Sequence, residues 1–189
     1  MGRRLFDLHT VRGLVLCGLL AGTLLAASLT AWELLHPSMI AEAPAGDLRE
    51  RGLAFPVAGI PREVTDSFTD RRGIARLHHA IDIMAARGTP VRAVDEGTIV
   101  KLASGGIGGT TIYQHDPADR YCYYYAHLQA YASGLHEGQK VARGDVIASV
   151  GSTGNAAENA PHLHFAIYRL DERKDCATGM PVNPYPLLR

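Results

Sequence analysis

Pro161-His162-Leu163-His164-Phe165 is a run in which histidine alternates with large apolar residues. Successive residues of a β-strand point to opposite faces, so a strand here would project His162 and His164 side by side. Leu163 and Phe165 would then face a core. The run therefore predicts a strand with one buried face and one face that carries two imidazoles.

A second run, His78-His79-Ala80-Ile81-Asp82, repeats this alternation near the middle of the chain. In a strand, His78, Ala80 and Asp82 would share one face, and the small Ala80 would leave room for an ion. Together the two runs can place two imidazoles and one carboxylate around a metal. Three nitrogen and oxygen ligands with an open fourth position are typical of catalytic zinc, which favours a metal-dependent hydrolase.

The composition excludes several other kinds of protein. The 189 residues include nineteen basic and nineteen acidic side chains, so no charge excess indicates a nucleic-acid partner. No Cys-x-x-Cys motif occurs, which argues against a thiolate zinc site or a redox motif. Cys17 lies in an apolar run, so Cys122 and Cys176 are the only residues left to form a disulfide. The sequence leaves open whether they pair.

The N-terminal part of the chain is expected to span a membrane. Residues 13–32 are twenty consecutive uncharged residues, close to the length that a hydrocarbon core of ~30 Å requires. Three arginines precede them, and positive charge marks the cytoplasmic side of a membrane segment. We therefore expect residues 1–12 to be cytoplasmic and the rest of the chain to be exported.

The alternative interpretation of this segment is a cleaved signal peptide. Ala26-Ala27-Ser28 resembles a small-residue cleavage site, but the apolar part of a signal peptide is usually shorter than this run. We therefore expect a retained, single-pass inner-membrane anchor. Residues 33–52 then form a linker that contains prolines and glycines, and residues 53–189 form the exported domain.

The exported domain is predicted to be mainly β. Short apolar or alternating runs are separated by glycine, proline, aspartate and asparagine, which is typical of an antiparallel sheet, sandwich or barrel. The predicted strands are residues 80–84, 90–93, 97–102, 110–115, 122–127, 145–150 and 162–168. Residues 137–147 resemble the strand–turn–strand of lipoyl and biotinyl carriers, but no lysine occupies the turn, so a carrier function is not supported.

Five short motifs occur in the order found in the lysostaphin/LytM-type zinc metallopeptidases, which the chain resembles over about residues 55–186. They are His78-x-x-x-Asp82, Gly88-Thr89-Pro90-Val91, Tyr125-Ala126-His127-Leu128, Gly151-Ser152-Thr153-Gly154 and His162-Leu163-His164. Members of this family are endopeptidases of bacterial cell-wall peptidoglycan. One departure is Ala80, where the family usually has glycine, and alanine is the next smallest residue.

The resemblance implies the fold and the role of each site residue. It implies a curved antiparallel β-sheet with a substrate groove, the lysostaphin-like duplicated hybrid motif. It also implies that one zinc ion per chain is held by His78, Asp82 and His164. His127 and His162 would handle the attacking water and the transition state, because no glutamate of an HExxH motif is present.

Other residues in these motifs receive simpler interpretations. Tyr125, two residues from His127, is the one tyrosine expected to contact substrate. Gly151-Ser152-Thr153-Gly154 lacks the ending of a phosphate-binding loop and is interpreted as a tight turn or a groove wall. The remaining histidines of the domain, at positions 79, 115 and 136, are expected to be structural or on the surface.

Together with the expected anchor, the resemblance implies a bacterial envelope with the domain in the periplasm. The sequence thus predicts a membrane-anchored zinc endopeptidase that cuts peptide stems or cross-links of peptidoglycan. The alternative is a catalytically idle relative that binds peptidoglycan, or activates another hydrolase, through the same groove. All five predicted metal and catalytic positions are occupied, which favours the enzyme. The bond that is cut and the oligomeric state are left open, and any inhibition is expected to come from a separate regulatory protein.

Overall fold

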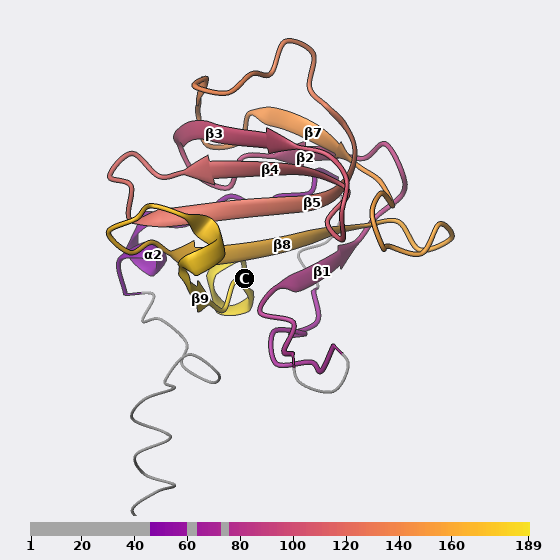
Figure 1. The fold of residues 1–189 in the computed structure, drawn as a ribbon, viewed down its shortest axis with the longest axis horizontal. Helices are drawn as coiled ribbons and strands as arrows, with labels where there is room; N and C mark the ends of the chain where they lie inside the picture. The colour runs from indigo at the N-terminus through magenta and orange to yellow at the C-terminus, as the bar shows by residue number, and fades with distance from the viewer. Residues whose placement is uncertain (1–45, 60–63, 73–75) are drawn as a thin grey trace, which may run out of the picture. The chain divides into compact units, whose positions relative to one another are not determined.

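The computed structural model describes residues 46–59, 64–72 and 76–189 (Figure 1). The expected cytoplasmic residues 1–12 and membrane segment 13–32 lie outside these ranges. Among the helices that the structure describes, none is both long enough and apolar enough to cross a bilayer.

The described part of the chain is built around nine strands that pair only in antiparallel fashion. They are β1 (Ile81–Met84), β2 (Pro90–Arg92), β3 (Gly97–Ala103), β4 (Thr110–His115), β5 (Tyr121–Tyr131), β6 (Lys140–Val141), β7 (Val146–Val150), β8 (His162–Arg169) and β9 (Met180–Val182). The main order is β1-β8-β5-β4-β3-β6, and the sheet does not close into a barrel. Figure 1 shows β3, β4, β5 and β8 running side by side.

The long strand β5 belongs to two parts of the sheet. Its first half, from Tyr121 to Ala126, pairs with β8, whereas the half that begins at Leu128 pairs with β7. His127 lies between these halves with a positive φ of 59°. A non-glycine residue in this conformation interrupts the regular alternation of side chains, so the face presented by β5 changes at His127.

The mainly β, antiparallel prediction is confirmed, and each predicted strand overlaps an observed one. The two short strands β6 and β9 were not predicted, because two or three residues give too little pattern to recognise. The predicted alternation from His78 to Asp82 is wrong in one respect. β1 begins only at Ile81, and His79 has a φ of 54°, so His78 lies before the strand rather than on its face.

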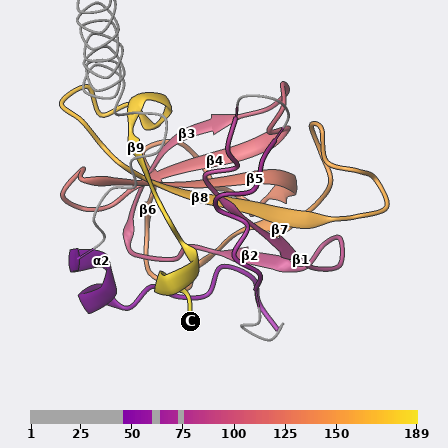
Figure 2. The same cartoon turned by 90° about the horizontal axis from the view of Figure 1, so that it is seen from below.

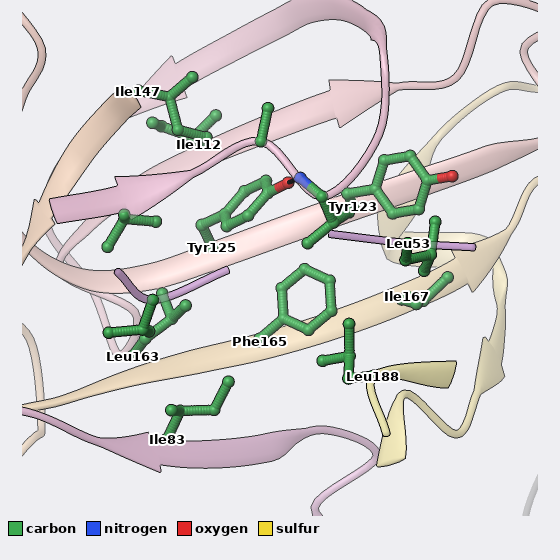
Figure 3. Packing of buried hydrophobic residues seen from close by; sticks show 14 of the residues in the cluster. Leu53, Ile83, Ile112, Tyr123, Tyr125, Ile147, Leu163, Phe165, Ile167 and Leu188 are labelled. Atoms are coloured by element: carbon green, nitrogen blue, oxygen red, sulfur yellow. Dashed lines mark hydrogen bonds between the residues drawn. The ribbon is translucent and has the colours of Figure 1, made fainter. Parts of the chain in front are cut away.

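The core lies against one face of the sheet (Figure 3). Tyr123, Tyr125 and Phe165 are among its largest fully buried side chains. The rings of Tyr125 and Phe165 lie 5.2 Å apart between centroids. The hydroxyl of Tyr125 donates to Gln114 at 2.9 Å and accepts from the backbone N–H of Val94 at 3.0 Å, so its polar end is satisfied although it is buried.

A short helix, α2 (Gly46–Arg51), belongs to the domain although the sequence assigned it to the linker. Leu48 is fully buried in the core. Arg51 donates from Nη1 to Asp95 at 3.1 Å and from Nη2 to Asp116 at 2.9 Å, and both carboxylates are almost completely buried. The domain therefore includes residues 46–52, and the predicted boundary at residue 53 is corrected.

The C-terminal segment contacts the rest of the domain at two places. Cys176, at the start of the 3₁₀ helix η2 (Cys176–Thr178), forms a disulfide with Cys122 of β5. Further on, the 3₁₀ helix η3 (Tyr185–Leu187) lies beside α2 (Figure 2), and residues of both segments line a shallow pocket. The pairing that the sequence left open is thus present in the structure.

Candidate metal centre and cleft

Ligand atoms of three predicted residues form a triangle in the structure. Nε2 of His78 lies 3.0 Å from Nδ1 of His164, and Oδ1 of Asp82 lies 3.1 Å from each of these nitrogens. Zinc that is bound tetrahedrally at about 2.0–2.1 Å from each ligand holds its ligands roughly 3.3–3.4 Å apart. The three atoms are therefore spaced as an ion of this kind requires.

Strand pairing and local hydrogen bonds produce this convergence. Asp82 of β1 is directly opposite His164 of β8, so the sheet itself brings the two side chains together. The ring of His78 donates from Nδ1 to the carbonyl oxygen of Ser67 at 3.0 Å. In the neutral ring this bond places the proton on Nδ1 and makes Nε2 available as a ligand, and it is an outer hydrogen bond of the kind that orients metal-binding histidines.

The protonation states also suit a cation. Burial acts to raise the pKa of Asp82, but its interactions with the adjacent rings of His164 and His78 outweigh burial and hold that pKa well below its usual range. Burial lowers the pKa of His164, so its imidazole is neutral near pH 7. Metal ligands must be deprotonated, and the ionised Asp82 beside the neutral His164 meets that condition.

A second pair of histidines lies next to the triangle. The rings of His127 and His162 are 4.9 Å apart between centroids, and the ring of His127 is 5.6 Å from that of His164. Nε2 of His162 lies 3.9 Å from Oδ1 of Asp82. The structure therefore brings together all five residues that the sequence assigned to metal binding and catalysis.

Both rings of this second pair are held through Nδ1. His162 donates to the carbonyl oxygen of Ala160, and His127 donates to that of Thr153, each at 2.8 Å. A carbonyl oxygen only accepts, so Nδ1 carries the proton in both rings and each Nε2 is the free base when the ring is neutral. Burial lowers the pKa of His127, which favours the neutral form.

Thr153 is a positioning residue that the sequence did not identify. Its hydroxyl accepts from the N–H of Thr110 and donates to the carbonyl of Leu128, both at 2.9 Å. These bonds tie the turn at residues 151–154 to β4 and β5. Gly154, with a φ of 72°, allows the close approach, because a Cβ atom there would meet the carbonyl oxygen of Ile107 at 2.2 Å. The residues of this glycine-rich motif do not themselves line the cleft, so its interpretation as a groove wall is not supported; Asn155, Ala156 and Ala157, which follow it, do line the cleft.

The metal triangle and the histidine pair line one cleft of about 530 Å³. Its aromatic wall consists of Tyr113, Tyr124 and Tyr168. Tyr125 is fully buried in the core and does not reach the cleft, which corrects its assignment as a substrate-contacting residue. Tyr125 was chosen because it is near His127 in the sequence, but the positive φ of His127 shifts the alternation of β5, so Tyr124 faces the cleft instead.

Two arginines beside the metal triangle were also missed. Nη2 of Arg72 contacts Oδ2 of Asp82 and lies 3.1 Å from Nε2 of His78. Arg76 lines the same cleft. Little in the sequence points to either residue, because the antiparallel pairing of Arg71 with Leu77 that places them is a single isolated bridge.

The other histidines that the structure describes lie in three different surroundings. His79 lies 5.5 Å from the ring of Phe68 and is also part of the cleft lining, whereas His136 is exposed. His115 is buried with its Nε2 3.6 Å from the sulfur of Cys176. Although His115 lies close to both cysteines, their sulfurs are joined in the disulfide and provide no thiolate for a second metal site.

Comparison with known proteins agrees with this geometry. Residues 76–184, more than half of the chain, match the model of peptidase family M23, and the chain belongs to this family. The resemblance drawn from the five motifs is thereby confirmed. The matched region contains all five metal and catalytic candidates.

Individual relatives cover the same region. The chain is 34% identical over 150 residues to the L-Ala–D-Glu endopeptidase of Bacillus subtilis, a match to 76% of this chain and 44% of that protein. It is 30% identical over 109 residues to the peptidoglycan DD-endopeptidase ShyC of Vibrio cholerae, covering 55% of this chain and 24% of the relative. The chain thus spans less than half the length of both curated relatives.

A solved structure shows the same fold. The catalytic domain of the antimicrobial peptidase lysostaphin from Staphylococcus simulans aligns with a TM-score of 0.54 at 27% identity. The alignment covers 78% of this chain and 98% of that domain. The predicted lysostaphin-like fold is therefore confirmed for the β-sheet domain.

Proposed function

We propose that this protein is a membrane-anchored, zinc-dependent endopeptidase that hydrolyses peptide stems or cross-links of bacterial peptidoglycan. The observation that carries the proposal is the ligand triangle of His78, Asp82 and His164 beside two histidines whose Nε2 atoms are free, all in one cleft. Membership of peptidase family M23 and the names of the relatives support the substrate class.

His78, Asp82 and His164 would hold one zinc ion per chain. When bound there, zinc supplies the Lewis acidity that polarises a substrate carbonyl and makes water a stronger acid. The protein contributes an ionised Asp82 and a neutral His164, and the carbonyl of Ser67 keeps Nε2 of His78 available. No cysteine competes as a ligand in the described site, because Cys122 and Cys176 are joined to each other.

His127 and His162 would divide the proton transfers between them. We assign His127 as the base: its lowered pKa keeps Nε2 unprotonated near pH 7, so it can accept a proton from the attacking water. His162 would donate from a protonated Nε2 to the oxygen that becomes negative in the transition state. Its position 3.9 Å from Asp82 places it beside the metal ligands, where that oxygen would develop.

Digestion of purified sacculi tests the activity. The full chain should release peptide fragments identifiable by mass spectrometry, a chelator should abolish release, and added zinc should restore it. Release that is unaffected by a chelator would reject the metal mechanism. A zinc-loaded chain that binds sacculi but releases nothing, with or without candidate activator proteins, would instead establish the binding or activating relative.

The proposal also includes an anchor at residues 13–32 and a domain on the periplasmic side of the inner membrane. It rests on the uncharged twenty-residue run and the arginines before it. Cell fractionation should recover the protein with membranes, and protease added to spheroplasts should digest the domain. A soluble envelope protein whose N-terminus begins near Leu29 would establish a cleaved signal peptide instead.

A further inference from the structure

Arg72 and Arg76 face each other across a short antiparallel pair at the edge of the cleft. The backbone N–H of Arg72 donates to the carbonyl oxygen of Arg76 at 2.8 Å, and the neighbouring residues Arg71 and Leu77 form an antiparallel bridge. Residues directly opposite in such a pair project to the same side. Both arginines accordingly line the cleft that contains the metal triangle.

The two guanidinium groups differ in what balances their charge. Arg72 has Asp82 as its ion-pair partner. Among the residues that the structure describes, no carboxylate lies within ion-pair distance of Arg76. Two like charges placed opposite each other in a β pair destabilise it, and a bound anion would remove that cost.

The cleft contains no other acidic group that can serve Arg76. Asp82 is the one carboxylate among the described residues that line the cleft, and it is committed to the metal triangle and to Arg72. The lining therefore has an excess of positive charge even before a metal ion adds more. A planar guanidinium in such a place matches a carboxylate through two parallel hydrogen bonds.

We propose that Arg76, held at the cleft edge opposite Arg72, binds a free carboxylate of the substrate and selects acidic peptides over neutral ones. A peptide with a free carboxylate near the scissile bond would be preferred over a bridge made of glycine alone. A preference among peptides that are cleaved rests on the proposed function. A preference among peptides that are only bound does not.

The position of Arg72 limits where that carboxylate lies. Arg72 contacts two metal ligands, and its cross-strand neighbour Arg76 is roughly 5 Å away between Cα atoms. An extended peptide advances about 3.3 Å per residue. The carboxylate should therefore belong to a residue within about two positions of the bond that is cut.

Matched peptides test the selection. A stem peptide that the protein cuts would be prepared with each carboxylate near the scissile bond either free or converted to a carboxamide. Cleavage by the purified, zinc-loaded full chain would be compared with that by Arg76→Gln, Arg76→Lys and Arg49→Gln. Arg49 lies exposed on α2, away from the cleft, so its substitution removes the same charge without altering the lining.

The free acid should be cut with a kcat/KM roughly tenfold or more above that of the amide, mainly through KM, as expected for a charged hydrogen bond. Arg76→Gln should lower kcat/KM for the acid alone and bring the ratio near one. Arg76→Lys should keep part of the preference, and Arg49→Gln should keep all of it. Added salt should reduce the preference in the unaltered protein, because the rim is exposed.

Binding separates failure of this inference from failure of the proposed function. Affinity for the same peptides would be measured by fluorescence anisotropy in a His162→Ala background, with and without Arg76→Gln. If the protein cuts the acid and the amide equally well, or if Arg76→Gln leaves the preference for the acid intact, the inference is rejected. The proposed endopeptidase activity is then still supported. If the protein without the His162→Ala substitution cleaves neither peptide while binding still shows a preference for the acid that Arg76→Gln removes, that result supports the inference and rejects the proposed endopeptidase activity.

Discussion

Nδ1 of His127 lies 2.8 Å from the backbone carbonyl oxygen of Thr153, a residue 26 positions further along the chain. The hydroxyl of the same threonine accepts from the backbone N–H of Thr110 in β4 and donates to the backbone carbonyl of Leu128 in β5. One residue thus holds the segment that leads into the cleft-lining residues 155–157 and sets the tautomer of the proposed base.

Thr153→Val should lower kcat while the metal content stays unchanged. The substitution removes the hydroxyl that satisfies two backbone groups, so the carbonyl that orients His127 should become less well positioned. Thermal or urea unfolding should show a loss of about 1–3 kcal/mol. Thr153→Ser, which keeps the hydroxyl, is the matched control, and equal kcat values for the two variants would reject the positioning role.

Removal of a ligand should abolish metal binding. His78→Ala, Asp82→Ala and His164→Ala each leave two protein donors, too few for tight zinc binding. Metal content measured after purification in zinc-containing buffer should fall from about one ion per chain to near zero. His136→Ala removes an exposed histidine outside the cleft and should keep the metal. Full occupancy in the Asp82→Ala protein would show that the ligand set is wrong.

His127→Ala and His162→Ala should keep the metal but lose most hydrolysis, because neither ring is part of the ligand triangle. General acid–base catalysis contributes about 10²–10⁴-fold, so kcat should fall within that range. His164→Ala should lose metal and activity together, although it lies only two residues from His162. Loss of zinc in His162→Ala with retention in His164→Ala would reverse the two roles.

The acid side of the pH profile should report on His127. Burial lowers the pKa of this ring below its ordinary value of 6.5, and the base must be unprotonated to act. Activity should therefore persist as the pH falls through 6.5 and decline only below it. Measurements of kcat between pH 4.5 and 8 on metal-saturated protein provide the check; an acid limb above 6.5 would exclude His127 as the base.

The disulfide should stabilise the domain and keep the cleft wall in place. The bond spans 54 residues, and Cys176 and Ala177 line the cleft. By the chain-entropy estimate for a loop of this length, Cys122→Ser with Cys176→Ser should cost about 4 kcal/mol in the free energy of unfolding. KM should rise more than kcat falls. Mass spectrometry of the unreduced protein should find no thiol at either position available for alkylation.

The sequence by itself determined seven of the nine strands and indicated the three residues whose ligand atoms converge in the structure. Period-two alternation in residues 162–165 gave the buried and exposed faces of β8 correctly, since this strand is regular. The five motifs in order indicated a family that comparison confirms. Local patterns are sufficient here because regular strands and motif spacing are encoded by residues close together in the chain.

Other features depended on contacts between distant residues. The anchoring of α2 by Arg51 to Asp95 and Asp116 leaves no trace in the composition of the linker, so that boundary was placed too late. Tyr125 was assigned to the cleft because nothing in the sequence reveals the positive φ of His127, which changes the face that β5 presents.

The tertiary structure alone decided how the proposed base is oriented, that Cys122 and Cys176 pair, and that Arg76 lines the cleft. Each depends on contacts that exist only in the folded domain, made by the turn at Thr153, the η2 segment and the pair at Arg72 and Arg76. The physical reason is that residue type and spacing specify how a strand presents its side chains. Which groups then come within hydrogen-bonding distance is set by the packing of the whole domain.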